Sequence, residues 1–168
     1  MKRLICGILA LMSFLSAALC ETALEAEEKS VYAALEMDET LASLTQKYGE
    51  GIPDGEYLIF GDALCAFYEK SGRLRAKSLI YDDIREVAAL TKADFSLVRD
   101  FKQGRELQDL IDILDDGTEV LVMKLSDEDK AGTRKLICWK NESGGVLEAL
   151  FELDSGKWIL FALAEVKE

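Results

Sequence analysis

Cysteine is the residue type of this chain that could most readily do chemistry, and two of its four copies lie well inside the sequence. Cys65 and Cys138 each lie among apolar neighbours, in the segments Leu-Cys-Ala-Phe and Ile-Cys-Trp. Two such cysteines can form a disulfide in an oxidising compartment. Small thiols also pack in apolar segments of this kind without any bridge. The sequence leaves both readings open: a Cys65–Cys138 bridge across the fold, or two buried free thiols.

The chain contains no histidine. Serine and cysteine nucleophile systems use an imidazole to accept and return a proton near neutral pH, so the usual triads are excluded. The sequence also lacks a phosphate-binding glycine loop and a cluster of zinc-ligand spacing. We therefore expect no catalytic residues, no metal and no cofactor, and the pattern favours a protein that is not an enzyme.

Three cations alternate along one segment: Arg73, Arg75 and Lys77, with Leu74 and Ala76 between them. Successive side chains of a strand point to opposite faces, so a regular strand would place all three cations on one face. Such a stripe could receive an anionic ligand or partner. The alternative is a solvated sheet face balanced by nearby acids.

The N-terminus has the layout of an export signal. Lys2 and Arg3 precede an apolar stretch from Leu4 to Leu19, which is short for a membrane-spanning helix. Removing residues 1–20 removes two of 20 basic residues and none of 32 acidic ones, which leaves a net charge of −14. A chain of this charge is not expected to bind nucleic acid, nor an anionic bilayer without a lipid anchor. We divide the chain into an export signal (1–20), an acidic tether (21–29) and a single α+β domain (30–168).

Cys20 follows Ala17-Ala18-Leu19 and resembles the lipid-attachment cysteine of bacterial lipoprotein signals. Those signals have a small residue immediately before the cysteine, and Leu19 departs from that pattern. Plain signal-peptidase cleavage after Ala18 or Cys20 and an uncleaved leader are the alternatives. The expected location is therefore periplasmic or secreted, with membrane attachment only through a lipid on Cys20.

Apolar periodicity predicts the secondary structure of the rest of the chain. Residues 30–48 carry apolar side chains at three- and four-residue steps, which predicts one amphipathic helix. A loop is expected over 49–55, a strand over 56–60, and either a hairpin or a helix over 62–81. Helices are expected from Asp82 or Asp83, after a capping pair Thr91 and Asp94, and over 105–114.

The C-terminal third has the alternation and Ser-Gly turns of antiparallel strands. Strands are predicted over 118–125, 133–140, 146–153 and 158–166. The last is apolar at both alternating sets of positions, which predicts a central strand covered on both faces. The predicted class is thus α+β, with N-terminal and central helices packed on an antiparallel sheet of four to six strands and a C-terminal β-meander.

No family is recognised over the chain as a whole. The ending Asp154-Ser-Gly-Lys-Trp-Ile-Leu resembles the terminal hairpin of nuclear-transport-factor-2-like cone folds, whose sheet curls around a pocket. This resemblance implies an alternative function: a small-molecule pocket, or a hydrolase using carboxylates such as Glu148 or Glu152. Trp139 and Trp158 could line such a pocket or pack in the core. The main hypothesis is a small exported, envelope-associated, non-catalytic module that binds an unknown envelope protein or a small ligand.

Overall fold

The computed structural model of the protein describes residues 30–127 and 132–166. The expected export signal, its candidate lipid-attachment residue Cys20 and the expected tether over 21–29 lie outside the described residues. Among those residues, no helix has the length and apolar character that crossing a membrane requires.

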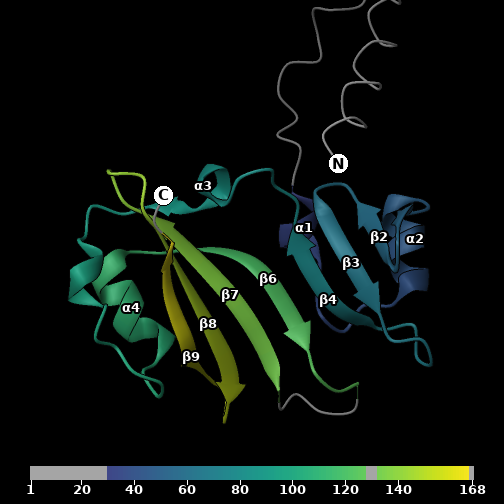
Figure 1. The fold of residues 1–168 in the computed structure, drawn as a ribbon. Helices are drawn as coiled ribbons and strands as arrows, with labels where there is room; N and C mark the ends of the chain where they lie inside the picture. The colour runs from purple at the N-terminus through teal and green to yellow at the C-terminus, as the bar shows by residue number, and fades with distance from the viewer. Residues whose placement is uncertain (1–29, 128–131, 167–168) are drawn as a thin grey trace, which may run out of the picture.

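Within the described ranges, nine strands form one sheet (Figure 1). The order is β1-β2-β3-β4-β6-β7-β8-β9 with every neighbouring pair antiparallel, and β5 lies parallel to the end of β7. The strands are β1 Ile52–Asp54, β2 Tyr57–Phe60, β3 Ala63–Phe67, β4 Leu74–Leu79, β5 Ala89–Leu90, β6 Thr118–Lys124, β7 Thr133–Lys140, β8 Val146–Asp154 and β9 Lys157–Val166.

The helices of the described chain are short. They are α1 Val31–Ala34, α2 Leu41–Tyr48, α3 Ile84–Val87 and α4 Leu107–Leu114, with one 3₁₀ turn over Phe95–Leu97. Figure 1 shows α2 near β2 at one end of the sheet and α4 near β9 at the other. The predicted α+β class is therefore wrong, because the protein is a β-rich fold in which one long sheet replaces the expected four to six strands and the helices are brief.

One face of the sheet carries most of the core, and we call it the covered face. The cross-strand register places one row of directly opposed residues on this face: Cys65, Lys77, Val122, Lys135, Phe151 and Leu160. At one end, α1 and α2 bury Tyr32, Leu35 and Leu44 against β3 and β4. At the other end, α4 buries Leu110 and Leu114 against β7, β8 and β9. The covered face thus holds two apolar clusters.

The predicted single helix over 30–48 is wrong because tertiary pairing interrupts it. Ser30 caps α1, which ends before Leu35, and the backbone then pairs with the β3–β4 turn. Leu41 N–H donates to the Gly72 carbonyl at 2.8 Å, and Leu74 N–H donates to the Glu39 carbonyl at 2.8 Å. A helix continuing through this stretch would lose both bonds, so helix propensity yields to strand pairing.

Other central elements lie where the sequence predicted an element, but some differ from the prediction in type or length. Residues 62–81 form the hairpin β3–β4, with Gly72 at φ +65° in its turn. The expected loop over 49–55 contains strand β1, whose Pro53 is tolerated because β1 is an edge strand. Asp83 caps α3 as expected, and Asp94, without a capping box from Thr91, caps the 3₁₀ turn.

The four C-terminal strands begin and end within one residue of the predicted bounds. The predicted central position of the last strand is wrong, because β9 is an edge strand. Leu160 faces the α4 cluster, whereas Phe161 on the opposite face is 39 % exposed. Leu160 also exchanges backbone hydrogen bonds with Gly104 and Arg105, so a loop segment, not a strand, protects part of this edge.

Candidate functional site

The face opposite the two clusters, which we call the open face, contains an apolar groove of about 490 Å³. Two adjacent rows of the register form its floor, Leu64–Ser78–Leu121 and Ala66–Ala76–Met123, which run across β3, β4 and β6. Neighbouring strands lie about 4.8 Å apart, so the floor is roughly 10 Å wide across the three strands. The groove is thus a feature of paired strands and not of a loop.

The groove is hollow because its middle carries small side chains. Ala66, Ala76 and Ser78 lie between larger residues that form its sides, among them Tyr57 and Leu125. The Ser78 hydroxyl lies 3.3 Å from the carbonyl oxygens of Leu79 and Val120, to which it can donate. The floor therefore offers an apolar surface with no unengaged hydroxyl.

Beside the groove, side chains and one helix of the chain itself occupy parts of the open face. On β7 and β8, Arg134 pairs with Glu152 at 2.8 Å, and the Arg134 guanidinium lies 4.2 Å from the centre of the Phe161 ring. Near the other end of β7, α3 packs Ile84 and Val87 against a small cluster that contains Cys138. Next to these groups, the groove over β3, β4 and β6 remains open.

The predicted basic stripe is divided between the two faces. Phe67 pairs with Leu74 and Ala66 pairs with Ala76, so Arg75 is an extra residue in a β-bulge. Because the bulge breaks the alternation, Arg75 lines the groove and is exposed, whereas Lys77 lies on the covered face and is only 7 % exposed. Arg73 precedes the strand and is exposed. The three cations do not form one site.

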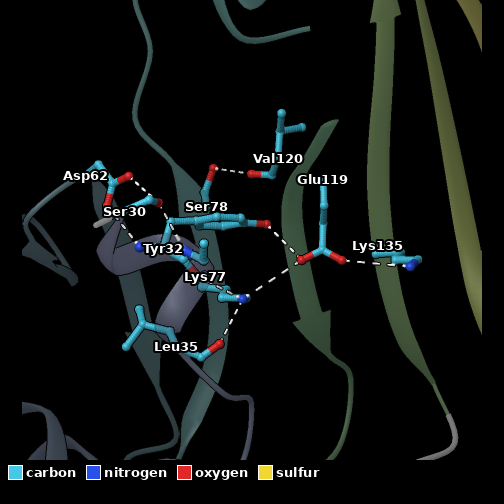
Figure 2. Close-up of polar contacts among 10 residues, drawn as sticks. Ser30, Tyr32, Leu35, Asp62, Lys77, Ser78, Glu119, Val120 and Lys135 are labelled. Carbon is cyan, nitrogen blue, oxygen red and sulfur yellow. Dashed lines mark hydrogen bonds and ion pairs between the residues drawn. The ribbon is translucent and has the colours of Figure 1, made fainter. Parts of the chain in front are cut away.

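Lys77 lies at a charged junction between the two apolar clusters (Figure 2). Its ammonium donates to the backbone carbonyls of Tyr32 at 3.0 Å and Leu35 at 2.8 Å, and lies 4.5 Å from the centre of the Tyr32 ring. Burial lowers the pKa of Lys77, and the carboxylate of Glu119, 3.9 Å away, opposes that shift. The ammonium thus holds α1 against β4 through the carbonyls of Tyr32 in the helix and of Leu35 at its C-cap.

Glu119 of β6 is shared by three groups, as Figure 2 shows. One carboxylate oxygen accepts from the Tyr32 hydroxyl at 3.3 Å and faces Lys77, while the other lies 3.8 Å from the ammonium of Lys135 on β7. Burial lowers the pKa of Lys135, against the attraction of Glu119. The Lys135 ammonium also lies 4.4 Å from the centre of the Trp158 ring on β9.

The start of α1 is fixed by a second set of polar contacts in the same view. Asp62, in the β2–β3 turn, accepts from the Ser30 hydroxyl at 2.6 Å and from the Tyr32 N–H at 2.9 Å. Burial opposes ionisation of Asp62, but these hydrogen bonds outweigh it and lower its pKa.

Perturbed pKa values often mark functional sites, but structural ion-pair networks perturb them too. Here the charged groups face one another: Lys77 is engaged by two carbonyls and Glu119, and Lys135 lies between Glu119 and Trp158. The arrangement links α1, β4, β6, β7 and β9. We therefore assign the junction a structural role and regard the groove as the candidate binding site.

Cys65 and Cys138 are free thiols and both are buried. Cys65 is on β3 and Cys138 on β7, with β4 and β6 between them in the sheet, so the structure does not bring them together. Burial raises the pKa of Cys65 to about 11 and that of Cys138 to about 12. Thiols of such pKa are poor nucleophiles near neutral pH.

The other residues considered from sequence do not converge on a site. Glu148 and Glu152 are four residues apart on β8, about 13 Å along a strand, and Glu152 is paired with Arg134. Trp139 is fully buried and donates from Nε1 to the Asp115 carbonyl at 3.0 Å.

Sequence reasoning missed the groove. Its only local signal is the pair of small residues Ala76 and Ser78, two positions apart on β4. Their role depends on β6, which pairs with β4 from a distant part of the chain.

Comparison with known proteins gives no further guide to function. No protein-family model matches this chain, and no curated protein sequence is significantly similar to it. The site is therefore interpreted from its geometry, without help from any relative.

Proposed function

We propose that this protein is an exported, non-catalytic binding module that holds a small apolar ligand in the groove on the open face of its sheet. The observation that carries the proposal is the groove itself. Its volume of about 490 Å³ lies within the ~300–1,000 Å³ of small-molecule sites, and its floor is apolar.

The lining supports binding rather than catalysis. The polar side chains that line the groove are Arg75, Lys124, Ser78 and Tyr57, and none of them is a carboxylate or a thiol. The Lys124 ammonium donates to the Met37 carbonyl at 2.6 Å, and the Ser78 hydroxyl faces two backbone carbonyls. A nucleophile and a general base within reach of one another, which group transfer needs, are not part of this lining.

Export is the part of the proposal that comes from the sequence. The basic start and the apolar stretch ending at Leu19 support a leader, and an acyl chain on Cys20 would keep the module at the envelope surface. A site for a small apolar ligand fits such a location, because binding in the groove requires no nucleotide or reduced cofactor.

The test is binding of a neutral fluorescent dye, N-phenyl-1-naphthylamine, whose emission rises in apolar surroundings. Wild-type protein should bind one dye molecule, and Ala76→Leu should abolish binding because the added side chain fills the floor. Ala162→Leu is the matched control, since Ala162 is an exposed alanine on the same face but on β9, outside the groove. Undiminished binding by a folded Ala76→Leu variant would contradict the proposal.

A further inference from the structure

We propose that the ligand of the groove is an amphiphilic anion, a molecule with one unbranched aliphatic chain and a carboxylate at its end, and that Arg75 binds the carboxylate. This inference rests on the proposed function and names its ligand class. It comes from the position of Arg75, a cation without an ion-pair partner among the described residues, at one end of an apolar floor.

Arg75 differs from the paired arginines of the described chain. Arg85, Arg99, Arg105 and Arg134 each form an ion pair with a carboxylate. Arg75 has no hydrogen bond, ion pair or ring contact among residues 30–127 and 132–166, and its side chain is exposed. In a chain with 32 acidic residues and 20 basic ones, an unpaired guanidinium at the rim of a groove is a specific attraction for an anion.

The bulge determines where this cation lies. Ala76 pairs with Met123, so the preceding residue, Arg75, lies beside Lys124 at the end of the groove where β6 ends. Arg75 therefore stands at one end of the apolar floor and not at its middle. A ligand that uses both must carry its charge at one end.

The floor determines the rest of the ligand. Leu64, Leu121 and Met123 offer only hydrocarbon and thioether contacts, and the Ser78 hydroxyl already faces two carbonyls. A ligand body with hydrogen-bonding groups would lose its water there without replacement, which is unfavourable. The small residues Ala66 and Ala76 form a narrow trough, which suits an unbranched chain better than a ring system.

The experiment measures displacement of the neutral dye by decanoate and by 1-decanol, which have the same chain length and differ in charge. On wild-type protein, decanoate should bind about tenfold more tightly than decanol, which corresponds to one charge-assisted contact at a partly exposed site. In Arg75→Gln, decanoate should fall to the affinity of decanol while decanol binding is unchanged. Arg73→Gln is the matched control, because Arg73 is exposed two residues earlier and does not line the groove.

The outcomes separate this inference from the proposed function. Equal affinity of wild-type protein for decanoate and decanol would overturn the role of Arg75 and leave the groove a site for neutral ligands. Dye binding that neither compound displaces would overturn the chain-like ligand. Failure of the dye itself to bind would overturn both proposals. Co-sedimentation with phosphatidylglycerol vesicles that decanoate does not inhibit would show a membrane surface as the occupant and would also overturn the inference.

Discussion

Replacing Glu119 with glutamine tests whether the charged junction holds the two apolar clusters together. The change keeps the shape of the side chain and an oxygen that can accept from the Tyr32 hydroxyl, but it removes the negative charge between Lys77 and Lys135. Both lysine side chains are largely buried, 8 % and 12 % exposed, so solvent can replace the lost partner only in part. We therefore expect the variant to be less stable.

The magnitude follows from the distances and the exposure. At 3.9 and 3.8 Å each pair has a Coulomb energy of about 4 kcal/mol at an effective dielectric constant of 20. Breaking a fully buried pair costs ~3–5 kcal/mol, but Glu119 is 35 % exposed, which screens its charge. The two carbonyls that bind the Lys77 ammonium also remain. We expect a loss of about 2 kcal/mol in the free energy of unfolding.

Urea unfolding followed by tryptophan fluorescence measures this loss, with Glu106→Gln as control. Glu106 pairs with Lys157, and their side chains are 45 % and 63 % exposed, so the substitution should cost at most ~1 kcal/mol. The double variant Glu119→Gln/Lys77→Met should lose less than the sum of the two single variants, because one of the two buried ammonium groups that lost their partner is then gone. A loss below ~0.5 kcal/mol for Glu119→Gln, or strict additivity in the double variant, would refute the reasoning.

Three further outcomes follow from the structure and the sequence. Because burial raises the pKa of Cys138 to about 12, the unfolded chain loses the thiol proton first as pH rises. Cys138 alone should therefore lower stability by about 2 kcal/mol between pH 8 and 10.5, Cys65 should add to the decline, and Cys138→Ala should remove the Cys138 part in urea titrations. Gly117→Ala should cost at least ~2 kcal/mol in thermal unfolding because its Cβ would lie 2.4 Å from the Ile137 side chain, whereas Gly145→Ala, whose Cβ would lie 3.3 Å from the Asn141 side chain, should cost less. Full-length precursor expressed in a bacterium should be released from membranes by detergent and not by high salt, and Cys20→Ser should abolish the attachment; soluble wild-type protein would contradict the anchor.

The C-terminal strands could be predicted because each is a long run of alternating residues bounded by a glycine turn. Gly144 and Gly156 adopt positive φ values of 85° and 84°, as hairpin turns require. The N-terminal helix could not be predicted in the same way. Its apolar spacing fits a helix over 30–48, but pairing of residues 39–41 with the β3–β4 turn is a long-range contact that no local pattern records. The predicted α+β class failed because long-range pairing extends the sheet to nine strands and leaves the helices of the described residues short.

The position of β9 failed for a different physical reason. An apolar run indicates that a strand is shielded from water, but it does not say what shields it. One face of β9 packs Leu160 against the α4 cluster, and on the other Phe161 lies under the Arg134 guanidinium. The Arg134 guanidinium over Phe161 and the loop that pairs with Leu160 thus shield β9 from water, where neighbouring elements of a central strand were expected.

The bulge at Arg75 explains why the sequence indicated a cationic stripe and the structure contains two separate sites. Period-2 alternation holds only while each residue has one partner on the next strand, and one extra residue on β4 moves Lys77 to the face opposite Arg75. Lys77 then meets Glu119 at the junction, and Arg75 reaches the end of the groove. The pairs on either side of the bulge, Phe67 with Leu74 and Cys65 with Lys77, already lie on the covered face, so deletion of Arg75 should close β4 into regular pairing. Leu74 and Lys77 would then keep their face, and the deletion should remove the cation from the groove while the junction at Lys77 stays intact.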